Sequence, residues 1–197
     1  MSVAAVTTHC CQVSGLHDCE DVLHPDFAGL VKTQKCIQVH FNDVNHFFTS
    51  TWNPVTEEVL LYDSLMYPVN WQARLQLWRC YSEKDKDLRC RFMSVQNQKD
   101  GVSCAFFATK FAEELCEGKD PETGSFDKGD LRNWFIKSFE NGALQQVNPR
   151  RGAKAPRVAL DALTSVFFIT PRDAIEYTEN RDFTSYVKNV PVPVIIL

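Results

Sequence analysis

Alternating apolar and polar positions predict three consecutive strands in the first half of the chain. Residues 36–41 (CIQVHF) alternate, residues 45–52 (NHFFTSTW) are rich in aromatic and β-branched side chains, and residues 58–63 (EVLLYD) are mostly apolar. Asn-Asp at 42–43 and Asn-Pro at 53–54 are turn sequences that separate these runs. The pattern therefore predicts a small antiparallel meander.

The centre of the chain switches to helical spacing and back. Residues 69–81 place Trp71, Leu75 and Trp78 at steps of four and three, which predicts a helix. Residues 88–95 alternate again and predict a short strand, whereas the polar residues 96–103 (QNQKDGVS) predict a loop.

Two further amphipathic helices are expected after this loop. The first begins at residue 104, and its apolar positions fall on one face: Cys104, Phe107, Ala108, Phe111, Ala112 and Leu115. Gly118 is placed to end it in the left-handed conformation. The second helix is expected over residues 128–140, with Asn141-Gly142 as its stop and four buried side chains: Leu131, Trp134, Phe135 and Phe139.

Mixed strand and helix patterns indicate an α+β protein with one main domain over residues 1–146. Residues 147–197 are expected to form a basic linker, centred on 148–157, and a C-terminal extension of unknown role. That extension contains a strand-like apolar run at 165–169 (SVFFI).

Composition narrows the class of protein. The chain of 197 residues is 44% hydrophobic and 12% aromatic, which is typical of a globular protein. A net charge of −4 gives no reason to expect binding to nucleic acid or to a membrane surface. With no apolar run of about 20 residues and no secretory signal at the start (MSVAAVTTHCC), we expect an intracellular protein. It would be cytoplasmic or nuclear, or located in a host cell if its source is a virus or an intracellular bacterium.

Cys104 is the leading candidate nucleophile among eight cysteines, most of which we expect to be buried thiols. It stands where a polar loop meets the N-terminus of an apolar helix. Backbone N–H groups and the helix dipole favour a thiolate there, and the amide of Cys104 would face an incoming carbonyl oxygen. The alternative is that Cys104 is only the first core residue of the helix.

His46 and Asp63 lie on consecutive predicted strands, so they can meet in space as a general base and the group that orients it. Gln98 lies six residues before Cys104 in the predicted loop, where a neutral amide donor suits an oxyanion hole. Each residue also has an ordinary interpretation, as a core histidine, a turn-capping aspartate and a solvated loop residue respectively.

The order of these four residues resembles the ubiquitin-like-protein-specific proteases, that is, the SUMO/sentrin proteases and their adenoviral and bacterial relatives. The motifs that carry the resemblance are Asn45-His46-Phe47, residues 61–65 (LYDSL) and residues 98–104 (QKDGVSC). Segments 15–18 (GLHD) and 118–121 (GKDP), with Phe126-Asp127 and Leu131-Arg132, are similar to transposon-encoded members. The resemblance covers roughly residues 15–140.

The resemblance implies a papain-like cysteine protease fold, with a central mixed sheet flanked by helices and the nucleophile at the N-terminus of a core helix. It implies cleavage after the Gly-Gly C-terminus of ubiquitin or a ubiquitin-like modifier, without a metal or other cofactor. Cys104 would be the nucleophile, His46 the base, Asp63 its orienting group and Gln98 the oxyanion donor. Conjugates of the modifier would be the partners, contacted by Asn45, Phe47 and Ser103.

Three departures from the family pattern affect substrate binding more than chemistry. Phe47 replaces the usual tryptophan after the histidine, and Ser103 and Ala105 replace the usual Asp and Gly around the nucleophile. We expect Ser103 to cap the helix still. Little chain precedes residue 15, where the family has a helix and a second tunnel aromatic.

Other functions remain open from the sequence. The same residues suit a self-processing or viral-type endopeptidase, or an acyltransferase, and the departures suit a catalytically weak binding module. A zinc site from the N-terminal histidines and cysteines is a poor alternative because adjacent cysteines chelate badly and no paired C-x2-C motif exists. Its candidate ligands are His9, Cys10, Cys11, His17, Cys19 and His24.

Overall fold

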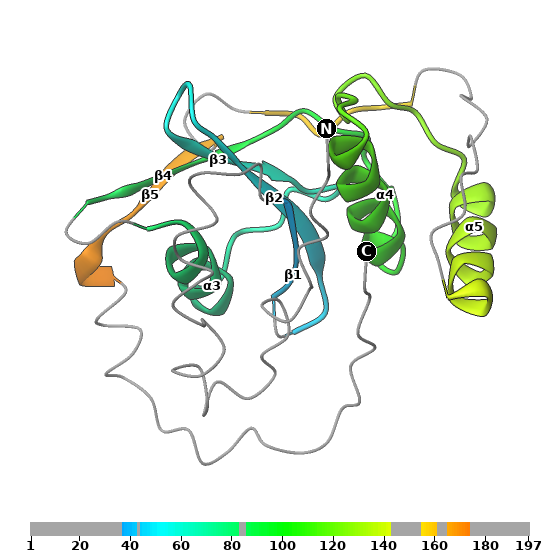
Figure 1. Cartoon of the computed structure of the whole chain (residues 1–197), viewed down its shortest axis with the longest axis horizontal. Coiled ribbons are helices and arrows are strands. Elements are labelled where there is room, and N and C mark those ends of the chain that lie inside the picture. The colour runs from blue at the N-terminus through cyan, green and yellow to red at the C-terminus, as the bar shows by residue number, and fades with distance from the viewer. Residues whose placement is uncertain (1–36, 43, 83–85, 143–154, 161–164, 174–197) are drawn as a thin grey trace, which may run out of the picture.

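The computed structural model shows an α+β fold in which a five-stranded mixed sheet packs against helices (Figure 1). It describes residues 37–42, 44–82, 86–142, 155–160 and 165–173. The candidate zinc ligands, the segments 15–18 and 148–154, and residues 174–197 lie outside this described part.

The predicted antiparallel meander is confirmed. β1 (Ile37–Phe41), β2 (Phe47–Asn53) and β3 (Glu58–Tyr62) pair in sequence order. The register places Phe41 opposite Phe47 and Thr49 opposite Tyr62. The start of β2 and the end of β3 therefore lie at the same end of the sheet.

Helix α3 (Trp71–Tyr81) forms where the spacing predicts it, and the Asn70 side chain caps it by accepting the Ala73 N–H. Of the three positions that the spacing indicates, Leu75 is buried and Trp78 is partly buried against the core. Trp71 is 38% exposed, while Ala73 and Leu77 are fully buried against the sheet. The small side chain of Ala73 allows the helix to approach the strands closely.

β4 (Leu88–Phe92) pairs parallel to β3, which makes the sheet mixed. It is shorter than the strand predicted over 88–95. Beyond β4 the Met93 N–H donates to the Leu61 carbonyl and the Val158 N–H donates to the Val95 carbonyl. Residues 93–95 are therefore bonded to the end of β3 and to the segment around Val158 and do not continue the strand.

Helices α4 (Cys104–Cys116) and α5 (Lys128–Asn141) confirm the two amphipathic predictions. The six apolar positions listed for α4 are all buried, and Gly118 and Gly142 have the positive φ angles of 75° and 64° that end such helices. In α5, Leu131 and Trp134 are buried, whereas Phe135 is half-buried against Phe106; the Phe139 side chain lies outside the described part.

The strand-like run beyond residue 146 also joins the sheet. β5 (Val166–Ile169) pairs antiparallel with β4 and forms one edge. Val158 packs in the core beside α4. Parts of the expected extension therefore contribute to the same sheet and core.

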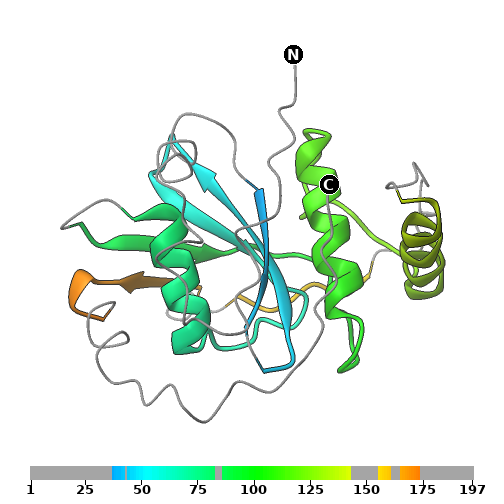
Figure 2. The same cartoon turned by 60° about the horizontal axis from the view of Figure 1, so that its bottom comes forward.

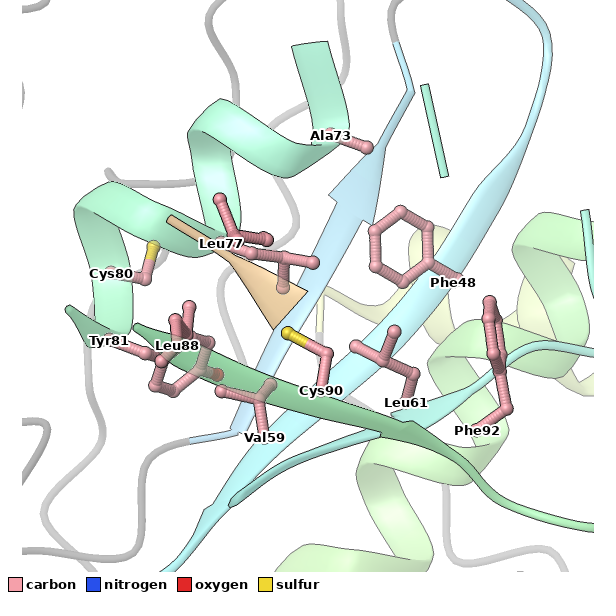
Figure 3. Close-up of a cluster of buried hydrophobic side chains, with 11 residues drawn as sticks. Phe48, Val59, Leu61, Ala73, Leu77, Cys80, Tyr81, Leu88, Cys90 and Phe92 are labelled. Carbon is pink, nitrogen blue, oxygen red and sulfur yellow. The ribbon is translucent and has the colours of Figure 1, made fainter. Parts of the chain in front are cut away.

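Two apolar clusters cover opposite faces of the sheet, because successive side chains of a strand point to opposite sides. Val59 and Leu61 of β3 face α3, as Figure 3 shows, whereas Tyr62 packs with Phe107 and Phe111 of α4. Viewed as in Figure 2, the sheet lies between α3 and α4, and α5 packs on the outer side of α4.

Candidate active site

Strand directions bring the four predicted residues to one end of the sheet. His46 immediately precedes β2 and Asp63 immediately follows β3, which is antiparallel to β2. Since β4 is parallel to β3, its carboxyl end lies at that same end and leads into the loop that holds Gln98 and Cys104. Two backbone hydrogen bonds tie these paths together, from Met93 to Leu61 and from Gln98 to Ser64.

A tight turn organised by Asn42 orients His46. The buried Asn42 side chain accepts the backbone N–H groups of Val44, Asn45 and His46 at 3.1, 3.0 and 2.9 Å. The Asn42 N–H also donates to the His46 carbonyl, at 2.9 Å. These bonds fix the backbone of the turn, so the imidazole starts from a defined position.

His46 and Asp63 form a buried pair. The Nε2 atom of His46 lies 2.7 Å from Oδ1 of Asp63, and both residues are 2% exposed. The Tyr67 ring packs on the imidazole with the ring centroids 5.1 Å apart. The second ring nitrogen, Nδ1, is thereby left for the thiol.

Asp63 is held in turn by the chain that follows it. Its Oδ1 accepts the N–H groups of Leu65 and Met66 at 2.8 and 3.0 Å, and its Oδ2 accepts that of Tyr67 at 3.1 Å. Met66 has a positive φ of 53°, which curls this loop around the carboxylate. With His46 added, the buried carboxylate lies within hydrogen-bond distance of four nitrogens.

Cys104 is the first residue of α4, and its thiol reaches the histidine turn. The residue is buried, and its Sγ lies 3.9 Å from the Asn45 carbonyl oxygen. The thiol also interacts with the His46 side chain and with the backbone N–H groups of Phe47 and Ala105. The sulfur thus meets two N–H donors, one carbonyl acceptor and an imidazole held by a carboxylate.

The pKa values of His46 and Cys104 are shifted in opposite directions. Burial alone would lower the pKa of His46, but hydrogen bonds and charge from Asp63 and Cys104 outweigh it and raise that pKa to about 9. Burial likewise opposes the Cys104 thiolate, but His46 and the surrounding N–H groups hold the pKa of the thiol below its ordinary value. Both shifts favour an imidazolium beside a thiolate.

Gln98 is buried rather than solvated, at 6% exposure, and both ends of its amide are bound. Its Oε1 accepts the hydroxyl of Ser64, the residue after Asp63. Its Nε2 donates to the Asp100 carbonyl oxygen at 2.5 Å. A primary amide nitrogen carries two hydrogens, so one of them remains for a further acceptor.

The three residues expected to contact substrate have different environments. Asn45 is exposed, and the half-buried Phe47 has its ring 4.8 Å from that of Phe41. Ser103 is fully buried, and it makes no cap to α4; its hydroxyl donates instead to Asp100 Oδ2 at 3.0 Å. The prediction of a serine cap is therefore wrong, because a nearer carboxylate takes the hydroxyl.

Asn42, Ser64 and Asp100 are site residues that the sequence reasoning missed. All three act by fixing a loop through side-chain hydrogen bonds, and each lies two to four residues from a predicted catalytic residue or beside one. The available signal was their type, since Asn, Ser and Asp favour such turns.

Within the described residues, no three histidine, cysteine or carboxylate groups cluster closely enough to bind a metal ion. Among the cysteines of the described part, Cys80, Cys90 and Cys104 are buried and Cys116 is exposed. None of the described helices combines the length and apolar character needed to cross a bilayer.

Sequence comparison adds no family assignment to this geometry: no protein-family model and no curated protein sequence matches the chain.

Proposed function

We propose that the protein is a cysteine peptidase or isopeptidase that cleaves after the Gly-Gly C-terminus of ubiquitin or a ubiquitin-like modifier. The observation that carries the proposal is the buried His46, which binds Asp63 at 2.7 Å and interacts with the Cys104 thiol on its other side. The choice of substrate depends on the resemblance of the motif order to the ubiquitin-like-protein-specific proteases. By the same resemblance, the mixed sheet and the helix that starts at Cys104 belong to a papain-like fold.

In this proposal the reaction begins from the thiolate and imidazolium pair. The Cys104 sulfur attacks the carbonyl carbon of the terminal glycine, and the negative charge moves to the carbonyl oxygen. The amide N–H of Cys104 and the free N–H of Gln98 Nε2 would stabilise that oxyanion. His46 then gives its proton to the leaving amine, which departs as the C–N bond breaks and leaves a thioester on Cys104.

Hydrolysis completes the cycle. His46, now neutral, takes a proton from water, and the resulting hydroxide attacks the thioester carbonyl. Collapse of the second tetrahedral intermediate breaks the C–S bond, releases the modifier with a free carboxylate and restores the ion pair. Asp63 keeps Nε2 protonated throughout, so Nδ1 faces the sulfur in each step.

Covalent capture tests the proposal. The purified protein is incubated with ubiquitin and ubiquitin-like modifiers that end in a propargyl amide, and its intact mass is measured. We expect one probe added to the wild type and none to Cys104→Ala. Cys116→Ala is the matched control, because it removes an exposed cysteine and we expect it to leave capture unchanged.

Other outcomes separate the alternatives. Capture of short peptide probes but of no modifier would favour an endopeptidase of the self-processing type. Binding of a modifier without any covalent adduct would favour the binding module. No adduct with any probe, or an adduct that persists in Cys104→Ala, would contradict the proposal.

A further inference from the structure

The side-chain carboxylate of Asp100 accepts several hydrogen bonds within the loop between Gln98 and Cys104. Asp100 Oδ1 accepts the backbone N–H groups of Val102 and Ser103, each at 2.9 Å. Its Oδ2 accepts the Ser103 hydroxyl at 3.0 Å and lies 2.7 Å from Lys128 Nζ at the start of α5. Asp100 therefore determines the path of the chain into Cys104.

The same residue also holds Gln98. The Asp100 backbone carbonyl accepts Gln98 Nε2, so the side chain folds back over the turn. Lys99 between them has a positive φ of 61°, and its N–H donates to the Asn97 side chain at 2.8 Å. A non-glycine residue in that conformation is maintained only where its surroundings fix it.

We propose that Asp100 is a positioning residue that sets the two oxyanion donors, the Gln98 amide and the Cys104 backbone N–H, and that it does so as a hydrogen-bond acceptor and not as a charge. This inference rests on the proposed function. One end of the loop bears Gln98 and the other bears Cys104, and Asp100 bonds to Gln98 itself and to Ser103, the residue before Cys104. An oxyanion hole works only when its donors are fixed before the charge develops.

Asp100 also contacts the residue at one departure from the family pattern. The resemblance leads us to expect an aspartate immediately before the nucleophile, where this chain has Ser103. Asp100, three residues upstream, binds both the N–H and the hydroxyl of Ser103.

The ion pair with Lys128 is the less important contact. The Lys128 side chain is 54% exposed and that of Asp100 is 24% exposed, so solvent screens their attraction. Burial alone would raise the pKa of Asp100, but Lys128 and the Val102 and Ser103 donors outweigh it and lower the pKa to about 2. The carboxylate is accordingly ionised at any pH at which activity would be measured.

Four variants distinguish the role of Asp100 as a hydrogen-bond acceptor from the role of its negative charge. Asp100→Asn keeps an oxygen at Oδ1 for the two N–H groups but loses the charge, whereas Asp100→Glu keeps the charge and moves the acceptor by one methylene. Asp100→Ala removes both. Lys128→Met removes only the ion pair.

Two readouts are compared, the turnover of a fluorogenic modifier substrate and the alkylation of Cys104 by iodoacetamide, which needs the thiolate but no oxyanion hole. For Asp100→Ala and Asp100→Glu we expect kcat to fall about tenfold or more, with KM and alkylation within about twofold. We expect Asp100→Asn and Lys128→Met to stay within about threefold of wild-type kcat.

Asp127→Ala is the matched control. Asp127 Oδ1 accepts two backbone N–H groups, those of Gly129 and Asp130, in the same pattern at the start of α5. We expect wild-type kcat for it. Melting curves identify any variant that does not fold. If Asp100→Ala does not fold, the contrast in kcat between Asp100→Asn and Asp100→Glu still tests the inference.

The results have distinct meanings. If the wild type turns over substrate and Asp100→Glu is as active as the wild type, or if Asp100→Asn is as impaired as the alanine variant, the inference is overturned and the proposed function stands. An equal loss of alkylation and turnover in Asp100→Ala also overturns it. If the wild type turns over no modifier substrate, the proposed function fails and this inference fails with it.

Discussion

His46 and Asp63 are 17 residues apart in the chain, yet Nε2 of one lies 2.7 Å from Oδ1 of the other in a site from which solvent is almost excluded. The contact follows from the register of β2 and β3, which places the start of one strand beside the end of the other. A charged carboxylate in that position raises the proton affinity of the imidazole.

Removing the charge of Asp63 while keeping its shape tests this contact. In Asp63→Asn an oxygen can still accept from His46, Leu65 and Met66, but the pKa of His46 falls because the negative charge is lost. We expect kcat/KM to fall about 10–100-fold with the fold retained, since each unit of pKa is a factor of ten in protonation. Unchanged kcat/KM would show that the charge is irrelevant to the site.

Asp63→Ala should act on stability as well. It leaves three backbone N–H groups without their acceptor, those of Leu65, Met66 and Tyr67. The expected loss is about 2–4 kcal/mol in the free energy of unfolding, measured by urea denaturation.

The strands and helices could be predicted because each carries its own pattern. The alternation in β1 and the apolar face of α4 are local properties of the sequence. The parallel pairing of β3 with β4 and the addition of β5 could not be predicted in this way, since they depend on which segments meet after folding.

The residues of the candidate site also fall into two groups, those that the sequence predicts and those that only the structure identifies. The grouping of Cys104, His46, Asp63 and Gln98 as a candidate site could be proposed from residue type and order. The roles of Asn42 and Asp100 depend on the path of a loop, because a side chain that accepts backbone N–H groups can be assigned only when those groups are located.

Asn42 should prove necessary for the position of His46. In Asn42→Ala three N–H groups lose their acceptor, so we expect a loss of about 1–2 kcal/mol in the free energy of unfolding. We also expect kcat to fall about tenfold, because a small displacement of the base is costly. Asn53→Ala is the control: its side chain accepts one N–H in an exposed turn, and both quantities should match the wild type.

Tyr67 should protect the ion pair from water. Its ring packs on His46 although the residue is 46% exposed. We expect Tyr67→Phe to keep wild-type kcat/KM and Tyr67→Ala to lower it about tenfold, because hydration weakens the interaction of His46 with Asp63. Phe168→Ala removes a ring of comparable exposure, 52%, from β5, away from the site, and should have no effect. Equal activity of the two Tyr67 variants would exclude the protective role.

His40 should make the fold sensitive to acid. It is fully buried between Ser50, at 2.6 Å, and Gln76, at 3.2 Å, and burial lowers its pKa from 6.5 to about 4 against the opposing hydrogen bond with Gln76. The unfolded chain therefore binds the proton more readily than the folded protein. Stability is highest above pH 6.5 and falls as the pH decreases toward 4, by about 3 kcal/mol from this group.

Urea denaturation of the wild type and of His40→Gln across this range measures the effect. The variant starts from a lower stability but should show a flatter dependence on pH, because the titrating group is gone. Parallel curves for the two proteins would show that His40 does not contribute to the acid sensitivity.

The pH dependence of Cys104 alkylation by iodoacetamide, followed by intact mass in the wild type and in His46→Ala, tests the thiolate and imidazolium pair most directly. His46 lowers the pKa of the Cys104 thiol, so the wild-type rate should reach its plateau at a pH below the ordinary thiol pKa, about 8.5, and His46→Ala should shift that curve to higher pH. A wild-type curve centred on the ordinary thiol pKa and unchanged by His46→Ala would contradict the account.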